Sequence, residues 1–254
     1  MAAFIDLARV SKHYGAQAAL DGVDLAVAEG EFVALVGGSG SGKTTLLKTI
    51  NGLIRPDAGG VTVAGQDVGA TPAHLVRRRI GYVFQEVGLF PHLTVAENIG
   101  VTPRLLGWDK VRIAGRVAEL LDLVALPREV GSRTPAALSG GQRQRVGVAR
   151  ALAAEPRLML MDEPFGALDP VTRDALGADY RALHERLGLT TVMVTHDMAE
   201  AVLLADRIVV LKSGRILADG TPAALLARSQ DADVRALLEA PKRQAERLRE
   251  RLGA

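Results

Sequence analysis

The amino-acid sequence predicts an α/β fold with a mainly parallel β-sheet, and three observations lead to this prediction. Short apolar runs of strand length recur along the chain, helical patterns separate them, and one run leads directly into a glycine-rich loop. Strands that alternate with helices form a parallel sheet whose two faces the helices cover. The 254 residues, 48% of them hydrophobic and 24% charged, can fill the core of such a domain.

The expected strands of the main sheet are continuous apolar runs, because both faces of a parallel sheet are buried. They lie at 32–36, 80–84, 158–161, 191–195 and 207–211, with a helix at about 197–205 between the last two. Alternating apolar residues at 4–10, within 23–36 and at 61–63 predict short strands of a second, antiparallel sheet beside the first.

The pattern becomes helical from 94 to about 154, which predicts a helical subdomain inserted into the core at about 86–157. We expect one main domain over 1–230, which contains this insertion, and a helical tail over 231–254. Basic residues alternate with glutamates in the tail. This alternation is typical of a solvated helix, and a regulatory or membrane-surface role is the alternative.

The glycine-rich loop matches the phosphate-binding pattern G-x-x-x-x-G-K-[ST], between a buried strand and an amphipathic helix. Its residues are Gly37, Gly38, Ser39, Gly40, Ser41, Gly42, Lys43 and Thr44, and Thr45 continues into the helix. Glycines let several backbone N–H groups point at one spot, and the start of the helix adds a positive dipole end. Lys43 is expected to contact the β- and γ-phosphates, and the Thr44 hydroxyl to bind Mg²⁺.

Two adjacent carboxylates follow the apolar run at 158–161. Asp162 and Glu163 therefore lie at the carboxyl end of a buried strand, where parallel sheets place functional groups. We expect Asp162 to hold Mg²⁺ and Glu163 to act as general base on a water molecule. The alternative is that both carboxylates only cap the next element.

A second glycine-containing helix start lies at Ser139, Gly140, Gly141 and Gln142. Ser139 and Gln142 have the spacing of a capping box, so a well-capped helix is the simpler interpretation. Two glycines in a first turn weaken a helix, however. They are expected where another group must approach the helix backbone closely. Because the P-loop already serves one nucleotide, this second phosphate site indicates the nucleotide of a partner molecule.

Three further side chains follow the same logic. His196 comes directly after the strand at 191–195 and can contact a γ-phosphate or orient the attacking water. Gln85 follows the strand at 80–84 and can reach Mg²⁺ or water. Tyr14 precedes Gly15 and can stack on a base, although a tyrosine is more often part of the core.

Composition excludes several classes of function. The sequence has no cysteine, which excludes disulfides and thiolate metal sites. Its net charge of +2 predicts no nucleic-acid partner. No apolar run approaches the roughly 20 residues that cross a bilayer, and the first residues do not resemble a signal peptide.

Taken in order, these motifs resemble the ATP-binding subunit of an ABC transporter, which implies a RecA-like P-loop NTPase core. Residues 37–44 are similar to Walker A, 158–162 to Walker B with Glu163 as catalytic glutamate, and 138–142 to the LSGGQ signature. The resemblance implies ATP and Mg²⁺ as cofactors and Lys43, Glu163 and His196 as catalytic residues.

The resemblance also assigns the remaining positions. Tyr14 is similar to the adenine-stacking aromatic, Gln85 to the Q-loop glutamine and His196 to the switch histidine. Residues 167–169, with Asp169 as a nucleotide-site residue, resemble the D-loop, although Gly166 stands where serine is common.

The resemblance implies an assembly on the cytoplasmic face of the inner membrane. Two copies of the chain, or one copy and a close paralogue, would form a head-to-tail dimer, with each ATP between the P-loop of one copy and the 139–142 helix start of the other. Membrane-embedded permease subunits would contact the segment at 85–99, which carries Leu89 and Phe90. A solute-binding receptor would act indirectly.

Residues 83–92 and 105–108 resemble a narrower group, the importers of osmoprotectants such as glycine betaine, choline or carnitine. An importer of polar amino acids is the alternative, since those importers share the pattern at 166–170. An exporter subunit fits less well, because the segment at 85–99 favours import. A soluble ABC ATPase also fits less well, because the sequence has one cassette and no long heptad run.

Overall fold

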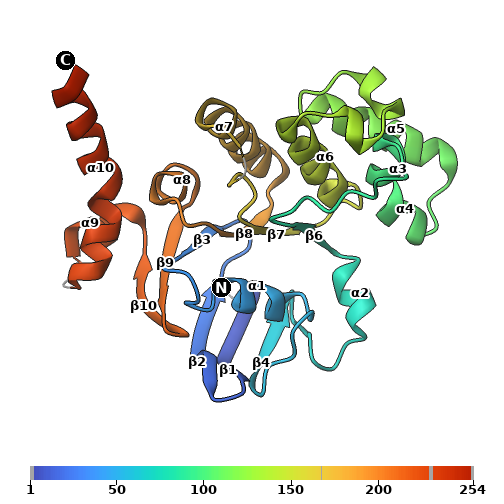
Figure 1. The fold of residues 1–254 in the computed structure, drawn as a ribbon. Helices are drawn as coiled ribbons and strands as arrows, with labels where there is room; N and C mark the ends of the chain where they lie inside the picture. Colours follow the sequence, from blue (N-terminus) through green and yellow to red (C-terminus); the bar gives the residue numbers. More distant parts are fainter. Residues whose placement is uncertain (1–2, 167, 229–230, 253–254) are drawn as a thin grey trace.

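The computed structural model describes residues 3–166, 168–228 and 231–252, which form two sheets and the helices packed against them (Figure 1). The strands are β1 (Ile5–Tyr14), β2 (Gln17–Val27), β3 (Phe32–Val36), β4 (Ala58–Val63), β5 (Gln66–Asp67), β6 (Ile80–Val83), β7 (Leu158–Asp162), β8 (Thr190–Val194), β9 (Arg207–Lys212) and β10 (Arg215–Gly220). The α-helices are α1 (Lys43–Ile50), α2 (Ala73–Arg77), α3 (Val95–Ile99), α4 (Val101–Leu105), α5 (Lys110–Leu123), α6 (Gly140–Leu152), α7 (Pro170–Leu187), α8 (Met198–Leu204), α9 (Pro222–Arg228) and α10 (Ala232–Leu252).

The main sheet has six strands in the order β10-β9-β3-β8-β7-β6. All neighbours in it are parallel except β10, which pairs antiparallel with β9. The second sheet has the order β2-β1-β4-β5 and is antiparallel, as Figure 1 shows below α1. The predicted fold class, an α/β core with an antiparallel β-subdomain and a helical insertion, is therefore confirmed.

The main sheet is the middle layer of the molecule, and its side chains alternate between two hydrophobic cores. On β3, Phe32, Ala34 and Val36 join the core beneath the helices, while Val33 and Leu35 join the core shared with α1 and the antiparallel sheet. The strand is completely buried because both of its faces are covered. This explains why its sequence is continuously apolar.

The carboxyl ends of the central strands are level with one another. Val194 at the end of β8 aligns with Leu35 on one side and with Asp162 on the other. The residues that follow β3, β7 and β8 are thus brought to one edge of the sheet. This register positions the candidate site.

The helical subdomain lies beyond β6, and its elements run from α3 to α6 (Figure 1). Thr94 caps α3 through a capping box with Glu97, and Asp109 caps α5 by accepting from the backbone N–H of Arg112. Leu120, Leu121 and Val146 bury the facing sides of α5 and α6. These local signals explain why the segment folds as helices although it interrupts the sheet.

The antiparallel sheet differs in detail from the prediction. β1 and β2 form one long hairpin, where the sequence pattern indicated short strands within 4–10 and 23–36. The left-handed Gly22 lies inside β2 near an irregularity in the pairing of β1 with β2 and does not end the strand. β10 was not predicted, because its alternating pattern is partly exposed and short.

At the carboxyl end of the chain, α9 and α10 follow β10, and α10 extends away from the sheets in Figure 1. Lys242 with Glu246, and Arg243 with Glu239, form ion pairs one helical turn apart. Among the described residues, no helix is both long and apolar enough to span a bilayer.

Candidate functional site

The glycine-rich loop joins β3 to α1 and is held from two sides. Gly37 and Gly42 have positive φ angles of 147° and 105°. A Cβ on Gly37 would overlap the carbonyl oxygen of Leu211 in β9, and one on Gly42 would overlap that of Ala19 in β2. Only glycine fits at these two positions, since both the backbone angle and the space exclude a side chain.

Lys43 is folded into the loop that precedes it. Its ammonium donates to the carbonyl oxygens of Gly37 at 2.8 Å and Gly38 at 2.9 Å. Burial lowers the pKa of Lys43, while the nearby Glu163 and Asp162 carboxylates oppose that shift. The Lys43 ammonium therefore lies inside the loop that the sequence predicts to bind phosphate.

Thr44 and Asp162 meet at the start of α1. The Thr44 hydroxyl donates to Asp162 Oδ1 at 3.0 Å, and only 6% of the surface of Asp162 is exposed. Burial raises the pKa of Asp162, against the effect of the Thr44 hydrogen bond and the Lys48 charge. A hydroxyl and a carboxylate beside a phosphate cradle form the oxygen donor set that suits Mg²⁺.

Glu163 lies one residue beyond the buried strand and has a positive φ of 46°. Its backbone N–H donates to the carbonyl oxygen of Val194, which fixes it to the end of β8. Its Oε2 accepts from Gln85 Nε2 at 3.0 Å and lies 3.3 Å from His196 Nδ1. A left-handed non-glycine residue is strained, and such strain is common at functional sites.

The structure thus brings together six of the predicted residues from four strand ends: Lys43, Thr44, Asp162, Glu163, His196 and Gln85, the last through its contact with Glu163. From its place in the sequence, Gln85 was expected to reach Mg²⁺ or water. In the structure its amide contacts the candidate base.

The predicted capping box at the start of α6 is present. Ser139 accepts from the backbone N–H of Gln142, and the Gln142 side chain accepts from the backbone N–H of Ser139. This helix start opens onto a hollow of about 450 Å³ that Leu168, Asp169 and Thr172 also line. Among its described lining residues, none belongs to the loop at 37–44.

Two other predicted residues lie apart from this group. Asp169 caps α7 by accepting from the backbone N–H of Thr172 at 3.0 Å, and this hydrogen bond lowers its pKa. Tyr14 ends β1 with 53% of its surface exposed, and the Lys12 ammonium lies 5.8 Å from its ring centre. Ala167 of the predicted D-loop lies outside the described residues.

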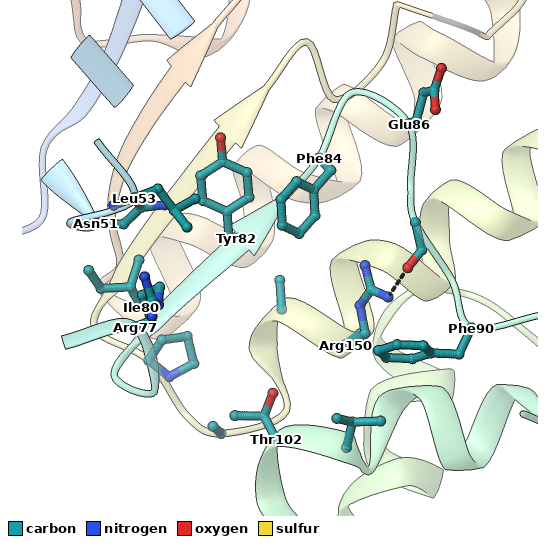
Figure 2. A pocket seen from close by; sticks show the side chains of 15 residues that line it. Asn51, Leu53, Arg77, Ile80, Tyr82, Phe84, Glu86, Phe90, Thr102 and Arg150 are labelled. Carbon is teal, nitrogen blue, oxygen red and sulfur yellow. Dashed lines mark hydrogen bonds between the residues drawn. The ribbon is translucent and has the colours of Figure 1, made fainter. Parts of the chain in front are cut away.

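A cleft of about 530 Å³ separates the end of α1 and strand β6 from the helical subdomain (Figure 2). Leu53, Tyr82 and Phe84 form one wall, and Phe90, Thr102 and Arg150 lie opposite. Phe84 and Phe90 are each 43% exposed. Leu89, which belongs to the segment expected to contact the permease, is partly buried against the core.

Arg150 and Tyr82 are residues that the sequence analysis missed. The Arg150 guanidinium donates to the carbonyl oxygens of Val87 and Gly88 and so fixes the segment after Gln85. Nothing in the local sequence of α6 distinguishes this arginine from its neighbours. In the sequence, Tyr82 is one of several apolar residues of a predicted strand. The structure distinguishes it, because it lies between the cleft and Asp162.

Known proteins resemble the chain over most of its length. A family model described as ABC transporter matches residues 20–166. The glycine betaine/carnitine/choline transport ATP-binding protein OpuCA of Bacillus subtilis is 51% identical over 87% of this chain and 59% of its own length. The glycine betaine uptake system ATP-binding protein YehX of Escherichia coli is 48% identical over 91% of this chain and 75% of its own length.

Other relatives have a different named solute. The sulfate/thiosulfate import ATP-binding protein CysA of Caulobacter vibrioides is 53% identical over 86% of this chain and 65% of its length. The chain spans about 60% of the length of the two Bacillus subtilis relatives that it matches, OpuCA and the choline transport protein OpuBA.

Among solved structures, the ATP-binding cassette MJ0796 has the same fold. Its dimeric post-hydrolysis form, bound to ADP and Pi, superposes with a TM-score of 0.79 and 34% identity, covering 85% of this chain and 98% of the other.

Proposed function

The chain belongs to the ABC transporter family of ATP-binding domains, and on this premise we propose that it is the ATP-hydrolysing subunit of an importer. The observation that carries the proposal is the meeting of the phosphate loop, the Thr44–Asp162 pair and the Glu163 carboxylate at one sheet edge. Positioned charge and hydrogen-bond donors supply most of the catalysis in phosphoryl transfer.

Each residue has a distinct part in this proposal. The ammonium of Lys43 exchanges its loop carbonyls for the β- and γ-phosphate oxygens of ATP. Glu163 accepts a proton from the attacking water, and His196 and Gln85 hold that carboxylate and the water in place. Thr44 and Asp162 would hold Mg²⁺, which neutralises charge on the phosphates when bound.

A second copy of the chain completes the site. The Ser139–Gln142 helix start is exposed and separate from its own P-loop, so the backbone N–H groups of Gly140 and Gly141 can bind the γ-phosphate held by another copy. The dimeric form of the similar cassette MJ0796 supports this arrangement. ATP binding would close the dimer, and hydrolysis would reopen it.

The cleft in Figure 2 is the proposed contact for the permease. Exposed aromatic side chains line this cleft, as is common at protein contact sites. Its lining includes Phe84 and Glu86, the two sequence neighbours of Gln85, so an occupant of the cleft is close to the reacting groups. We place the chain at the cytoplasmic face of the inner membrane, bound to permease subunits and served indirectly by a solute receptor.

The solute that we propose is an osmoprotectant such as glycine betaine, choline or carnitine. Relatives named for these solutes are 48–51% identical to the chain. The CysA relatives, at 53% identity, favour sulfate or thiosulfate as the second candidate.

Uptake of labelled solutes tests this choice in cells with and without the chain, under salt stress for the osmoprotectants. We expect loss of betaine, choline or carnitine uptake when the chain is absent. Loss of sulfate uptake alone would replace the solute but leave the importer. A chain without ATPase activity, alone or with its permease, would contradict the importer proposal itself.

A further inference from the structure

Tyr82 lies between the cleft and the metal-ligand candidate Asp162. Its ring forms part of the cleft wall, and in Figure 2 its hydroxyl points away from Thr102 and Arg150. The Phe84 ring packs against it, with the ring centres 4.4 Å apart. The ring of Tyr82 therefore faces the cleft, and its hydroxyl points away from the opposite wall.

The sheet register places that hydroxyl near Asp162. Tyr82 on β6 aligns with Leu160 on β7, and Asp162 lies two residues further along the same strand. Side chains two residues apart point to the same face of a sheet, and a diagonal neighbour is within reach of an aromatic side chain. Tyr82 and Asp162 thus share the face that also carries α1 and Thr44.

The hydroxyl itself is buried, and it forms no direct hydrogen bond of ordinary geometry with another residue that the structure describes. A buried hydroxyl without a partner costs free energy, so its position calls for an explanation. Burial raises the pKa of Tyr82, and the neighbouring Asp162 carboxylate adds to the shift. The phenol is accordingly a neutral O–H donor in the neighbourhood of the Asp162 carboxylate.

We propose that Tyr82 is a positioning residue that connects the wall of the cleft to the Asp162 carboxylate. Its hydroxyl supports the Asp162 carboxylate, which also accepts from Thr44, and Phe84 holds the ring that carries the hydroxyl. An occupant of the cleft that moves Phe84 changes the support of Asp162, and with it the hold on Mg²⁺. This inference rests on the proposed ATP-binding function and adds a second route, separate from Gln85.

Binding of a fluorescent ATP analogue to the purified chain, with and without Mg²⁺, tests the proposal. The measured quantity is the gain in ATP affinity that Mg²⁺ provides. Tyr82→Phe removes only the hydroxyl and should reduce this gain roughly 10-fold, as changes behind a metal ligand commonly do. Affinity for the analogue without Mg²⁺ should stay unchanged.

Phe84→Ala tests the connection to the cleft, because the Phe84 ring lines the cleft and contacts the Tyr82 ring. It should also reduce the gain, and the double variant Y82F/F84A should lose no more than Y82F alone. Tyr180→Phe is the matched control for a buried tyrosine hydroxyl, since Tyr180 contacts Thr191 instead. Leu75→Ala, at 44% exposure and outside the cleft, is the control for Phe84.

The outcomes separate the two levels of inference. A wild-type gain in Y82F would overturn the role of Tyr82, and a reduced gain in Y82F with an unchanged gain in F84A would overturn its connection to the cleft. Equal losses in Y180F or L75A would show a general effect of destabilisation and overturn both. A wild-type chain that binds no ATP would contradict the proposed function itself.

Discussion

The Gln85 amide donates a 3.0 Å hydrogen bond to Glu163 Oε2, linking the segment after β6 to the end of β7. The same oxygen lies 3.3 Å from His196 Nδ1. The candidate base is therefore held from both neighbouring strand ends. Because Gln85 also begins the segment that lines the cleft, a movement there reaches Glu163 through one side chain.

Glu163→Gln should abolish ATP hydrolysis while leaving ATP binding intact. The amide keeps the size and one acceptor oxygen of the side chain but cannot accept the proton of water, so we expect a loss of at least about 100-fold in kcat. Phosphate release measures the rate, and sedimentation should show an ATP-bound dimer that persists. Glu29→Gln, a surface carboxylate paired with Arg157, is the control. Activity within a few-fold of wild type would remove Glu163 from this role.

Ser139→Arg should prevent ATP-driven dimerisation with little loss of nucleotide affinity in the monomer. The arginine side chain is larger than serine and would fill the hollow of about 450 Å³ at the start of α6. Its positive charge is also unfavourable at a helix N-terminus. Sedimentation velocity with ATP is the measurement. Ser132→Arg places the same cation on another exposed serine of the helical subdomain and should dimerise normally. Normal dimers in S139R would contradict the shared site.

Glu200 should make the protein less stable as the pH rises towards neutrality. Burial raises its pKa from 4.5 to about 7, while Thr195 and the charges of Arg173 and His196 oppose this and Asp197 adds to it. The folded state then holds a proton that the unfolded state has released, so stability falls between about pH 4.5 and pH 7.

Glu200→Gln should remove this dependence. One pKa unit corresponds to 1.36 kcal/mol, so the free energy of unfolding of the variant at pH 8 should exceed that of the wild type by at most about 3 kcal/mol. Denaturant unfolding at pH 5 and pH 8 measures it. A variant whose stability changes between the two pH values as much as that of the wild type would contradict the assignment.

Gly37→Ala should destabilise the fold and prevent nucleotide binding, because the new Cβ meets the Leu211 carbonyl oxygen and the φ angle is positive. Strain and overlap together should cost about 2–4 kcal/mol. Gly38→Ala is the matched control for stability, since a Cβ at that position would have no atom within 4 Å apart from those of its chain neighbours. The midpoint of thermal unfolding distinguishes them, and equal midpoints would contradict the packing argument.

Much of the fold could be predicted because the central strands are buried on both faces and therefore carry an unbroken apolar signal. β7 illustrates this: its run ends in Asp162, and the structure ends the strand there. The sequence pattern of β10 is weaker because its side chains alternate between exposed and partly buried. The pattern of the β1–β2 hairpin is weaker because irregular pairings interrupt its register.

The candidate site divides in the same way. Residues at strand ends were found from sequence, because strand order alone brings them together. Tyr82 and Arg150 were not, since the first depends on a diagonal contact across two strands and the second on backbone carbonyls 62 and 63 positions away. No local pattern encodes such contacts.

The two carbonyl oxygens that press on Gly37 and Gly42 come from different sheets and from opposite ends of the sequence. Gly214, just after β9, also donates its N–H to the Ser41 carbonyl oxygen at 3.0 Å. One wall of the loop thus exists only after β9 has been synthesised and has docked beside β3, so we expect the loop to take its final shape late in folding. A nascent chain that has emerged no further than β8 contains every predicted catalytic side chain up to Glu163, and yet lacks the Leu211 and Gly214 contacts that hold the phosphate loop.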